Sequence, residues 1–128
     1  MKVIDGKNAV LGRLASYAAK QALKGEEIAI LNCEQIVISG DKQFIRNEFQ
    51  KKRKMIVTLQ VGPKHSKNND KIVKRVIRGM LPTPKWTRGR EAYKKIKCYI
   101  GVPKEFEKSE KITFENNLKN KFIQIKEI

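Results

Sequence analysis

The apolar residues in the first third of the chain change from extended to helical spacing and back. Lys2–Asp5 has the pattern of a short strand that ends at a turn. From Leu11 to Leu23 apolar side chains recur at i, i+3, i+4 and i+7, which predicts a helix with one alanine-rich stripe, ended by Gly25. Ile28–Cys33 is a continuous apolar run, typical of a strand covered on both faces. Strand, helix and strand in this order predict a βαβ unit with a parallel sheet.

The next stretch contains a further candidate strand and a second helix. Ile36–Ile38 is short and apolar, and Asp41 is placed to cap a helix that continues to about Lys54. The expected inner face of this helix consists of Phe44, Ile45 and Phe49. After it, Met55–Val61 is apolar and partly alternating, and a polar basic loop continues to Asp70.

The pattern from Lys71 to Leu81 predicts a helix with two unlike faces, closed by Pro82 and Pro84. Its apolar face consists of Ile72, Val73, Val76, Ile77, Met80 and Leu81. Its opposite face carries only positive charge, from Lys71, Lys74, Arg75 and Arg78. Like charges at these spacings repel each other, and bound phosphates would relieve that repulsion. We therefore favour an anion-binding face over a merely solvated helix surface.

The last third is less regular. Thr87–Lys95 is a candidate fourth, short helix, and Ile96–Ile100 alternates like a strand that Gly101 stops. The tail from Glu105 is expected to be irregular, apart from an extended segment at Phe122–Ile128. The whole pattern predicts one α/β domain over residues 1–128, with a small, mostly parallel sheet of about four strands flanked by helices, and basic loop and helix extensions.

Positive charge divides the chain into three parts. Residues 1–41 and residues 105–128 are each neutral, with five basic and five acidic residues apiece. Residues 42–104 hold 19 basic residues against three acidic ones, which accounts for the whole net charge of +16. Such a concentration exceeds the magnitude of roughly 2–8 that solubility of a small domain requires. It predicts a polyanionic partner, in the first place nucleic acid, bound by the central part.

The residue types needed for catalysis are not gathered in this sequence. His65 is the only histidine, and the acidic residues lie mostly outside the basic segment where a two-metal nuclease would need them. Asp5 and Glu34 follow strands, where the sites of α/β proteins collect, but surface or capping roles are favoured for both. Cys33 and Cys98 are expected to be buried free thiols, in keeping with a reducing cytosol. We therefore predict no enzyme, no metal, no cofactor, no small-molecule substrate and no membrane partner.

Binding to RNA has candidate residues on several elements, each with an alternative interpretation. Arg46 and the basic run Lys51–Lys54 either form a solvated helix end or bind phosphate, and phosphate binding is favoured. For Trp86 two interpretations have about equal weight: a core residue, or a surface residue that stacks on a base. The predicted RNA-binding residues are Arg46, Lys51, Lys52, Arg53, Lys54, Lys64, His65, Lys67, Lys71, Lys74, Arg75, Arg78, Lys85, Trp86, Arg88, Arg90 and Lys94.

Four ordered motifs resemble one known family. They are Val3-Ile4-Asp5 with Leu11–Ser16, Leu31-Asn32 with Ile36–Gly40, Arg78-Gly79-Met80-Leu81-Pro82, and Arg88-Gly89 with Lys97–Gly101. Together they resemble the L-thirteen family of large-subunit ribosomal proteins over roughly residues 2–104. The basic stretch Lys51–Lys67 is similar to the archaeal and eukaryotic branch.

This resemblance implies a non-catalytic, cytoplasmic protein of the large ribosomal subunit. Such a protein would bind and bridge large-subunit rRNA, contact neighbouring ribosomal proteins and join the subunit early in assembly. The charge distribution by itself leaves two alternatives open, namely a free-standing DNA- or RNA-binding protein and a small nucleic-acid-processing enzyme.

Overall fold

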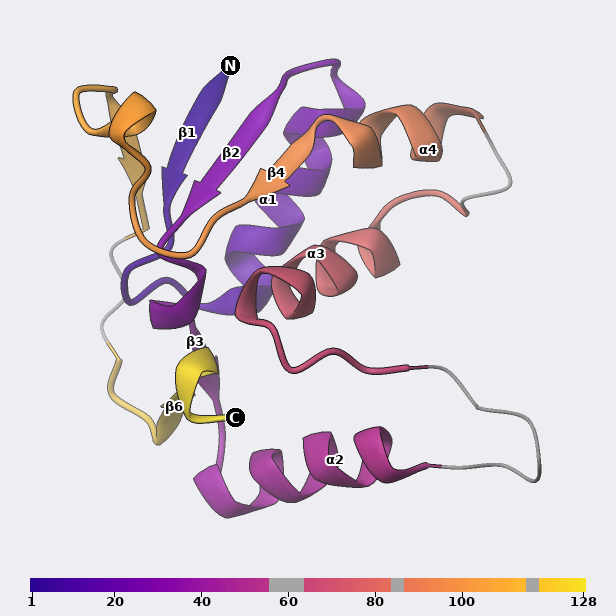
Figure 1. Ribbon diagram of the computed structural model, residues 1–128, viewed down its shortest axis with the longest axis vertical. Coiled ribbons are helices and arrows are strands. Elements are labelled where there is room, and N and C mark those ends of the chain that lie inside the picture. The colour runs from indigo at the N-terminus through magenta and orange to yellow at the C-terminus, as the bar shows by residue number, and fades with distance from the viewer. Residues whose placement is uncertain (56–63, 84–86, 115–117) are drawn as a thin grey trace.

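The computed structural model describes residues 1–55, 64–83, 87–114 and 118–128 (Figure 1). The strands are β1 (Lys2–Asp5), β2 (Ile28–Leu31), β3 (Val37–Ser39), β4 (Ile96–Cys98), β5 (Lys111–Thr113) and β6 (Phe122–Gln124). The helices are α1 (Leu11–Leu23), α2 (Lys42–Lys54), α3 (Asn69–Met80) and α4 (Thr87–Lys94). Short 3₁₀ turns are η1 (Cys33–Gln35), η2 (Lys104–Phe106) and η3 (Ile125–Glu127).

Four strands form the main sheet, in the order β4-β2-β1-β5, and every pair is parallel. The register aligns Ile4 of β1 with Ile30 of β2 and Ile112 of β5, and Ile30 in turn with Cys98 of β4. The predicted α/β fold with a small parallel sheet is confirmed. The βαβ unit predicted at the start of the chain forms its centre.

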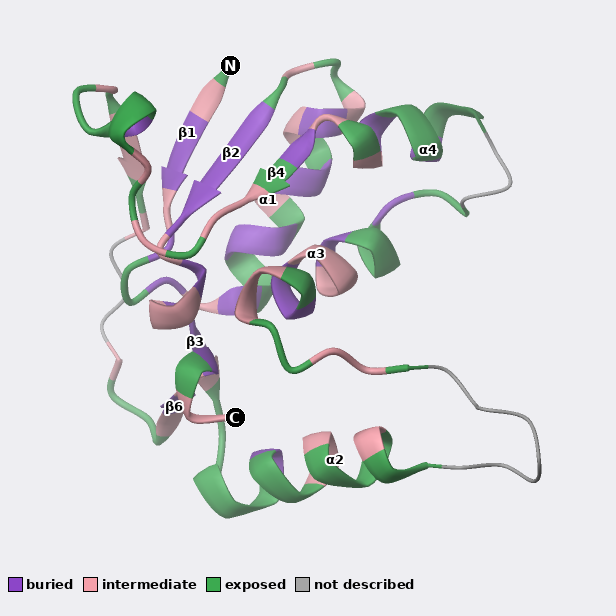
Figure 2. Ribbon diagram, viewed as in Figure 1, coloured by how far each residue is buried: buried purple, intermediate pink, exposed green. Residues whose placement is uncertain are grey.

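The two faces of this sheet are covered differently, because neighbouring residues of a strand point to opposite sides. Ile4 and Ile30 point toward α1, α3 and α4 and belong to the larger apolar core. Val3 and Leu31 point the other way and pack with Phe106 of η2. Figure 2 shows both central strands buried along most of their length. Helices α1, α3 and α4 thus lie on one side of the main sheet.

Helix α1 packs closely against its neighbours because its buried stripe is mostly alanine. Ala15, Ala18, Ala19 and Ala22 are all buried in the larger core. The helix ends as predicted: the Gly25 N–H donates to the Ala22 oxygen at 3.0 Å, with the Gly25 φ at +99°. A residue with a side chain rarely adopts that φ, so glycine is suited to this position.

The tail is more ordered than the sequence pattern indicated. β5 adds the fourth strand to the main sheet, beside β1. β6 pairs with β3 in a separate two-stranded antiparallel sheet, where Ile38 aligns with Ile123. The prediction of an irregular tail was therefore wrong at β5, whereas the extended segment predicted at Phe122–Ile128 is confirmed over Phe122–Gln124. The strand predicted at Ile36–Ile38 forms as β3 but lies outside the main sheet. β5 has only three residues, so its sequence carries too little periodicity to be recognised before its partner is known.

Helix α2 stands apart from the main sheet and contacts β6 (Figure 1). Its predicted cap is confirmed, since the Phe44 N–H donates to the Asp41 carboxylate at 3.1 Å. Its predicted inner face is only partly correct: Ile45 is buried and Phe49 half-buried, whereas Phe44 is 65% exposed. A helix that touches so little of the core buries a narrower stripe than its sequence offers.

Three further predictions concern the two thiols, membrane-spanning helices and the apolar stretch that follows α2. Cys33 is a buried free thiol, as expected, and Cys98 is free but only half-buried. None of the helices in the described ranges is long and apolar enough to cross a membrane. Of the apolar stretch Met55–Val61, all but Met55 lies outside the described residues.

Candidate nucleic-acid interface

The basic residues of the central segment gather on α2, on the loop of residues 64–68, on α3 and on α4. Figure 1 shows the loop running between α2 and α3. Two groups differ in exposure. Arg53, His65, Lys74 and Arg75 are half-buried. The exposed ones are Arg46, Lys51, Lys52, Lys54, Lys64, Lys67, Lys71, Arg78, Arg88, Arg90 and Lys94.

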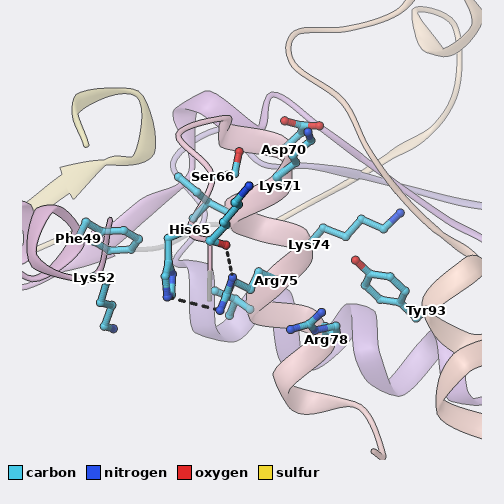
Figure 3. Close-up of a pocket in the computed structure, with 13 residues that line it drawn as sticks. Phe49, Lys52, His65, Ser66, Asp70, Lys71, Lys74, Arg75, Arg78 and Tyr93 are labelled. Atoms are coloured by element: carbon cyan, nitrogen blue, oxygen red, sulfur yellow. Dashed lines mark hydrogen bonds between the residues drawn. The ribbon is translucent and has the colours of Figure 1, made fainter. Parts of the chain in front are cut away.

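A cavity of about 580 Å³ lies where α2, the loop, α3 and α4 meet (Figure 3). We call it the α2–α3 hollow. Its lining is formed by Phe49, Lys52, Lys64, His65, Ser66, Asp70, Lys71, Ile72, Lys74, Arg75, Val76, Arg78 and Tyr93. Six of these residues are lysines or arginines, and Asp70 is the single carboxylate among them. The hollow therefore has a strongly positive potential that favours an anionic ligand.

Helix α3 has the two faces that its sequence predicts. Ile72, Val73 and Ile77 are buried against the larger core. The charged residues of the opposite face, Lys71, Lys74, Arg75 and Arg78, line the hollow. The apolar face is narrower than predicted at its edges, since Val76 is half-buried and lines the hollow, and Met80 is 43% exposed. Because the apolar face of α3 is buried in the core, its basic face is turned toward the hollow.

Arg75 fastens the loop to α3. Its Nη1 donates to the Lys64 carbonyl oxygen at 3.0 Å, and its Nη2 lies 3.4 Å from the His65 Nε2 (Figure 3). The arginine can only donate, so Nε2 must accept and the proton of a neutral imidazole is on Nδ1. Two neighbouring loop residues are therefore positioned by one guanidinium.

His65 lies among positive charges in a partly buried place. Burial, followed by the charges of Arg75, Lys52 and Arg53, lowers the pKa of His65 below its usual 6.5. The imidazole of the free protein is consequently neutral at pH 7. An anion bound in the hollow would offset these charges and raise the pKa again.

Tyr93 on α4 forms the wall of the hollow opposite α3, and sequence reasoning missed it. The Lys74 ammonium lies 4.9 Å from the centre of its ring, a cation–π contact. Close packing of α4 positions the ring: a Cβ on Gly89 would collide with the Pro82 carbonyl oxygen and lie 3.0 Å from its carbon. The available signal was an aromatic residue interleaved with lysines and arginines.

Two predicted residues of α2 are engaged inside the protein. The Arg46 Nε donates to the Glu127 carbonyl oxygen at 3.1 Å, and the Arg53 Nη1 donates to the Ile128 oxygen at 3.1 Å. Lys42 and Arg46 also form ion pairs with the Glu127 carboxylate, at 3.5 and 3.9 Å. These contacts hold α2 against the last residues of the chain. They leave Lys51, Lys52 and Lys54 as the exposed cations at the end of the helix.

The other predicted residues lie at the margin of this surface. Arg88, Arg90 and Lys94 are exposed on α4, and none of them lines the hollow. Lys67 is exposed in the loop, also outside the hollow. Lys85 and Trp86 lie outside the described residues.

The carboxylates that follow strands have structural partners. Asp5 Oδ1 accepts hydrogen bonds from the Lys7 N–H at 3.0 Å and from the Asn32 side chain at 2.8 Å. Glu34 Oε2 accepts one from the Gly101 N–H at 3.1 Å. Among the described residues, no group of three or more histidines, cysteines or carboxylates could hold a metal ion. Asp5 thus accepts a hydrogen bond within the turn that follows β1, and Glu34 accepts one from Gly101, 67 residues later in the sequence.

Comparison with known proteins decides the family. The family model described as Ribosomal protein L13 matches residues 1–105. The chain belongs to this family. The resemblance predicted from four motifs is confirmed, and the match includes α2, α3, α4 and the hollow between them.

Three curated relatives of this L13 family chain come from archaea. It is 44% identical to the large ribosomal subunit protein uL13 of Methanocaldococcus jannaschii, over all of this chain and 94% of that protein. It is 50% identical to uL13 of Methanococcus maripaludis, over 80% of this chain and 77% of the relative. It is 46% identical to uL13 of Thermoplasma volcanium, over 88% of this chain and 82% of that protein. The predicted similarity to the archaeal branch is thus confirmed.

Proposed function

We propose that this chain is a structural, non-catalytic protein of the large ribosomal subunit in the cytoplasm. It binds and bridges large-subunit rRNA, contacts neighbouring ribosomal proteins and joins the subunit early in assembly. The observation that carries this proposal is the family match over residues 1–105. Relatives named as large-subunit proteins support it.

The contacts with rRNA are made mainly through phosphates, by residues 42–104. This part holds the whole net charge, and its exposed lysines and arginines are spread over α2, the loop, α3 and α4. Neutralising phosphates releases the counterions condensed on RNA, which yields affinity without reading bases. The neutral ends supply the scaffold, since β1, β2 and β5 form three of the four strands of the main sheet.

Arg46 and Arg53 have a different part in this proposal. Their contacts with Glu127 and Ile128 position α2, so that Lys51, Lys52 and Lys54 reach the RNA. The hydrogen bond between Arg75 and His65 likewise has a positioning role, because it holds the loop beside α3.

Sedimentation tests the proposal against a free-standing nucleic-acid-binding protein. The tagged chain is expressed in an archaeal host, and cell extracts are separated on a sucrose gradient at low salt. Nearly all of the protein is expected in the fractions of the large subunit and of whole ribosomes. A protein that stays at the top of the gradient, or that follows DNA, would refute the proposal.

A further inference from the structure

The α2–α3 hollow contains more than a phosphate-binding surface needs. Beside its cations it is lined by two aromatic rings, Phe49 and Tyr93, and by the aliphatic side chains of Ile72 and Val76. Phosphate binding uses charge and hydrogen-bond donors and gains nothing from exposed apolar groups. The lining therefore matches a ligand that has both negative charge and a flat apolar face.

The size of the hollow agrees with such a ligand. Its volume of about 580 Å³ lies within the roughly 300–1,000 Å³ that is usual for sites of small organic ligands. A nucleotide has a phosphate and a planar base, and it is of this size. A whole RNA helix is far too wide to enter.

Tyr93 is the ring best placed for the base. The Lys74 ammonium lies over the face of the ring at 4.9 Å, so this face is turned toward α3 and the hollow. Figure 3 shows Lys74, Arg78 and Tyr93 together at one end of the hollow and Phe49 at the other. A base that stacks on Tyr93 would take the place of the ammonium, which can then pair with the phosphate of the same nucleotide.

We infer that the α2–α3 hollow holds one unstacked nucleotide of rRNA, with its base on Tyr93 and its phosphate on Lys74 and Arg78. The inference rests on the proposed function and adds the kind of RNA element that is recognised. In an A-form duplex each base is covered by its neighbours, so a ring can stack only on a nucleotide from a loop, a bulge or a strand end. Neighbouring phosphates remain in contact with the exposed lysines.

Substitutions of Tyr93 distinguish stacking from charge. Affinity for deproteinised large-subunit rRNA is measured by filter binding over a range of salt. Tyr93→Leu should weaken binding about five- to tenfold and leave the salt slope unchanged, because it removes a ring and no cation. Tyr93→Phe keeps the ring and should bind like the wild type. Tyr99→Leu is the matched control, since Tyr99 is also half-buried but packs against Phe106 on the other side of the sheet.

Equal affinity of Tyr93→Leu and the wild type would overturn this inference, as would a loss confined to Phe49→Leu. A wild-type protein that shows no preference for large-subunit rRNA over transfer RNA would instead refute the proposed function.

Crosslinking of the wild type gives a result that does not depend on how the variants fold. Large subunits that contain the tagged wild-type protein are irradiated with ultraviolet light, and adducts are mapped by mass spectrometry. A nucleotide adduct on Tyr93 is the expected result. Adducts elsewhere on the protein with none on Tyr93 would contradict the inference.

Discussion

The two faces of α3 should separate binding from folding. Lys71 and Arg78 are exposed, seven residues and thus about 10 Å apart along the helix, and both line the hollow. Ile77 is the neighbour of Arg78 in sequence but is fully buried in the larger core. We compare the double variant Lys71→Gln/Arg78→Gln with the single variant Ile77→Ala.

The double variant should lose affinity for rRNA and keep its stability. Each lost phosphate contact makes the slope of log affinity against log salt less negative by about 0.7–0.9, so two contacts change it by about 1.4–1.8. Surface substitutions usually change stability by less than about 0.5 kcal/mol. For a chain of 128 residues that corresponds to a shift of about 2 °C in the melting temperature.

Ile77→Ala should have the opposite effects. Truncation of a buried isoleucine to alanine costs about 2–5 kcal/mol, because it removes apolar contacts and leaves a cavity. With an unfolding entropy near 2.1 cal/mol/K per residue, the melting temperature should fall by about 7–19 °C. Below that temperature the salt slope should equal that of the wild type.

The assay combines circular dichroism melting with filter binding to deproteinised large-subunit rRNA. Lys20→Gln/Lys24→Gln is the matched control: both lysines are exposed, they lie at the end of α1, and they belong to the neutral segment. This control should leave the slope as it is. An unchanged slope for Lys71→Gln/Arg78→Gln would show that this face of α3 does not meet phosphate, and the interface would have to be placed elsewhere.

Three further perturbations test other contacts. The pKa of His65 is low in the free protein and should rise beside phosphate, so the complex binds more protons and rRNA affinity should increase as pH falls from 7.5 to 6. His65→Gln should remove that dependence, and its persistence would argue against the contact. Gly89→Ala should lower the melting temperature by several degrees, because the new methyl group collides with Pro82; an unchanged melting curve would show that α4 can shift freely. A hydrogen bond with Cys98 and burial raise the pKa of Cys33, so iodoacetamide at pH 8 should modify Cys98 well before Cys33 in the folded protein, and equal rates would contradict this environment.

Local periodicity was enough to predict most of the long elements. The stripe from Leu11 to Leu23 and the opposed faces of α3 follow from spacings within one helix, which need no knowledge of the rest of the chain. Asp41 caps α2 through a hydrogen bond to a residue three positions away, so that boundary was also visible. The concentration of positive charge in residues 42–104 could likewise be counted without knowing the fold, and it predicted a polyanionic partner.

Contacts between distant residues were decided only by the tertiary structure. The short strand β5 is recognisable once it pairs with β1, more than 100 residues earlier, because three residues carry no periodic signal of their own. Arg46 and Arg53 have the same sequence character as Lys51 and Lys52, yet the last residues of the chain accept their hydrogen bonds. The sequence around a basic residue shows its charge but not which distant group it will contact. Only the folded chain brings Arg46 and Arg53 next to their hydrogen-bond acceptors.

Tyr93 shows the same limit at the hollow. Its sequence neighbours identify a basic helix, but nothing local brings its ring within 4.9 Å of the Lys74 ammonium. That approach depends on the contact of Gly89 with Pro82 and on the packing of both α3 and α4 on the main sheet. The aromatic wall of the hollow is a consequence of packing, because only the folded chain places a residue of α4 opposite the charged face of α3.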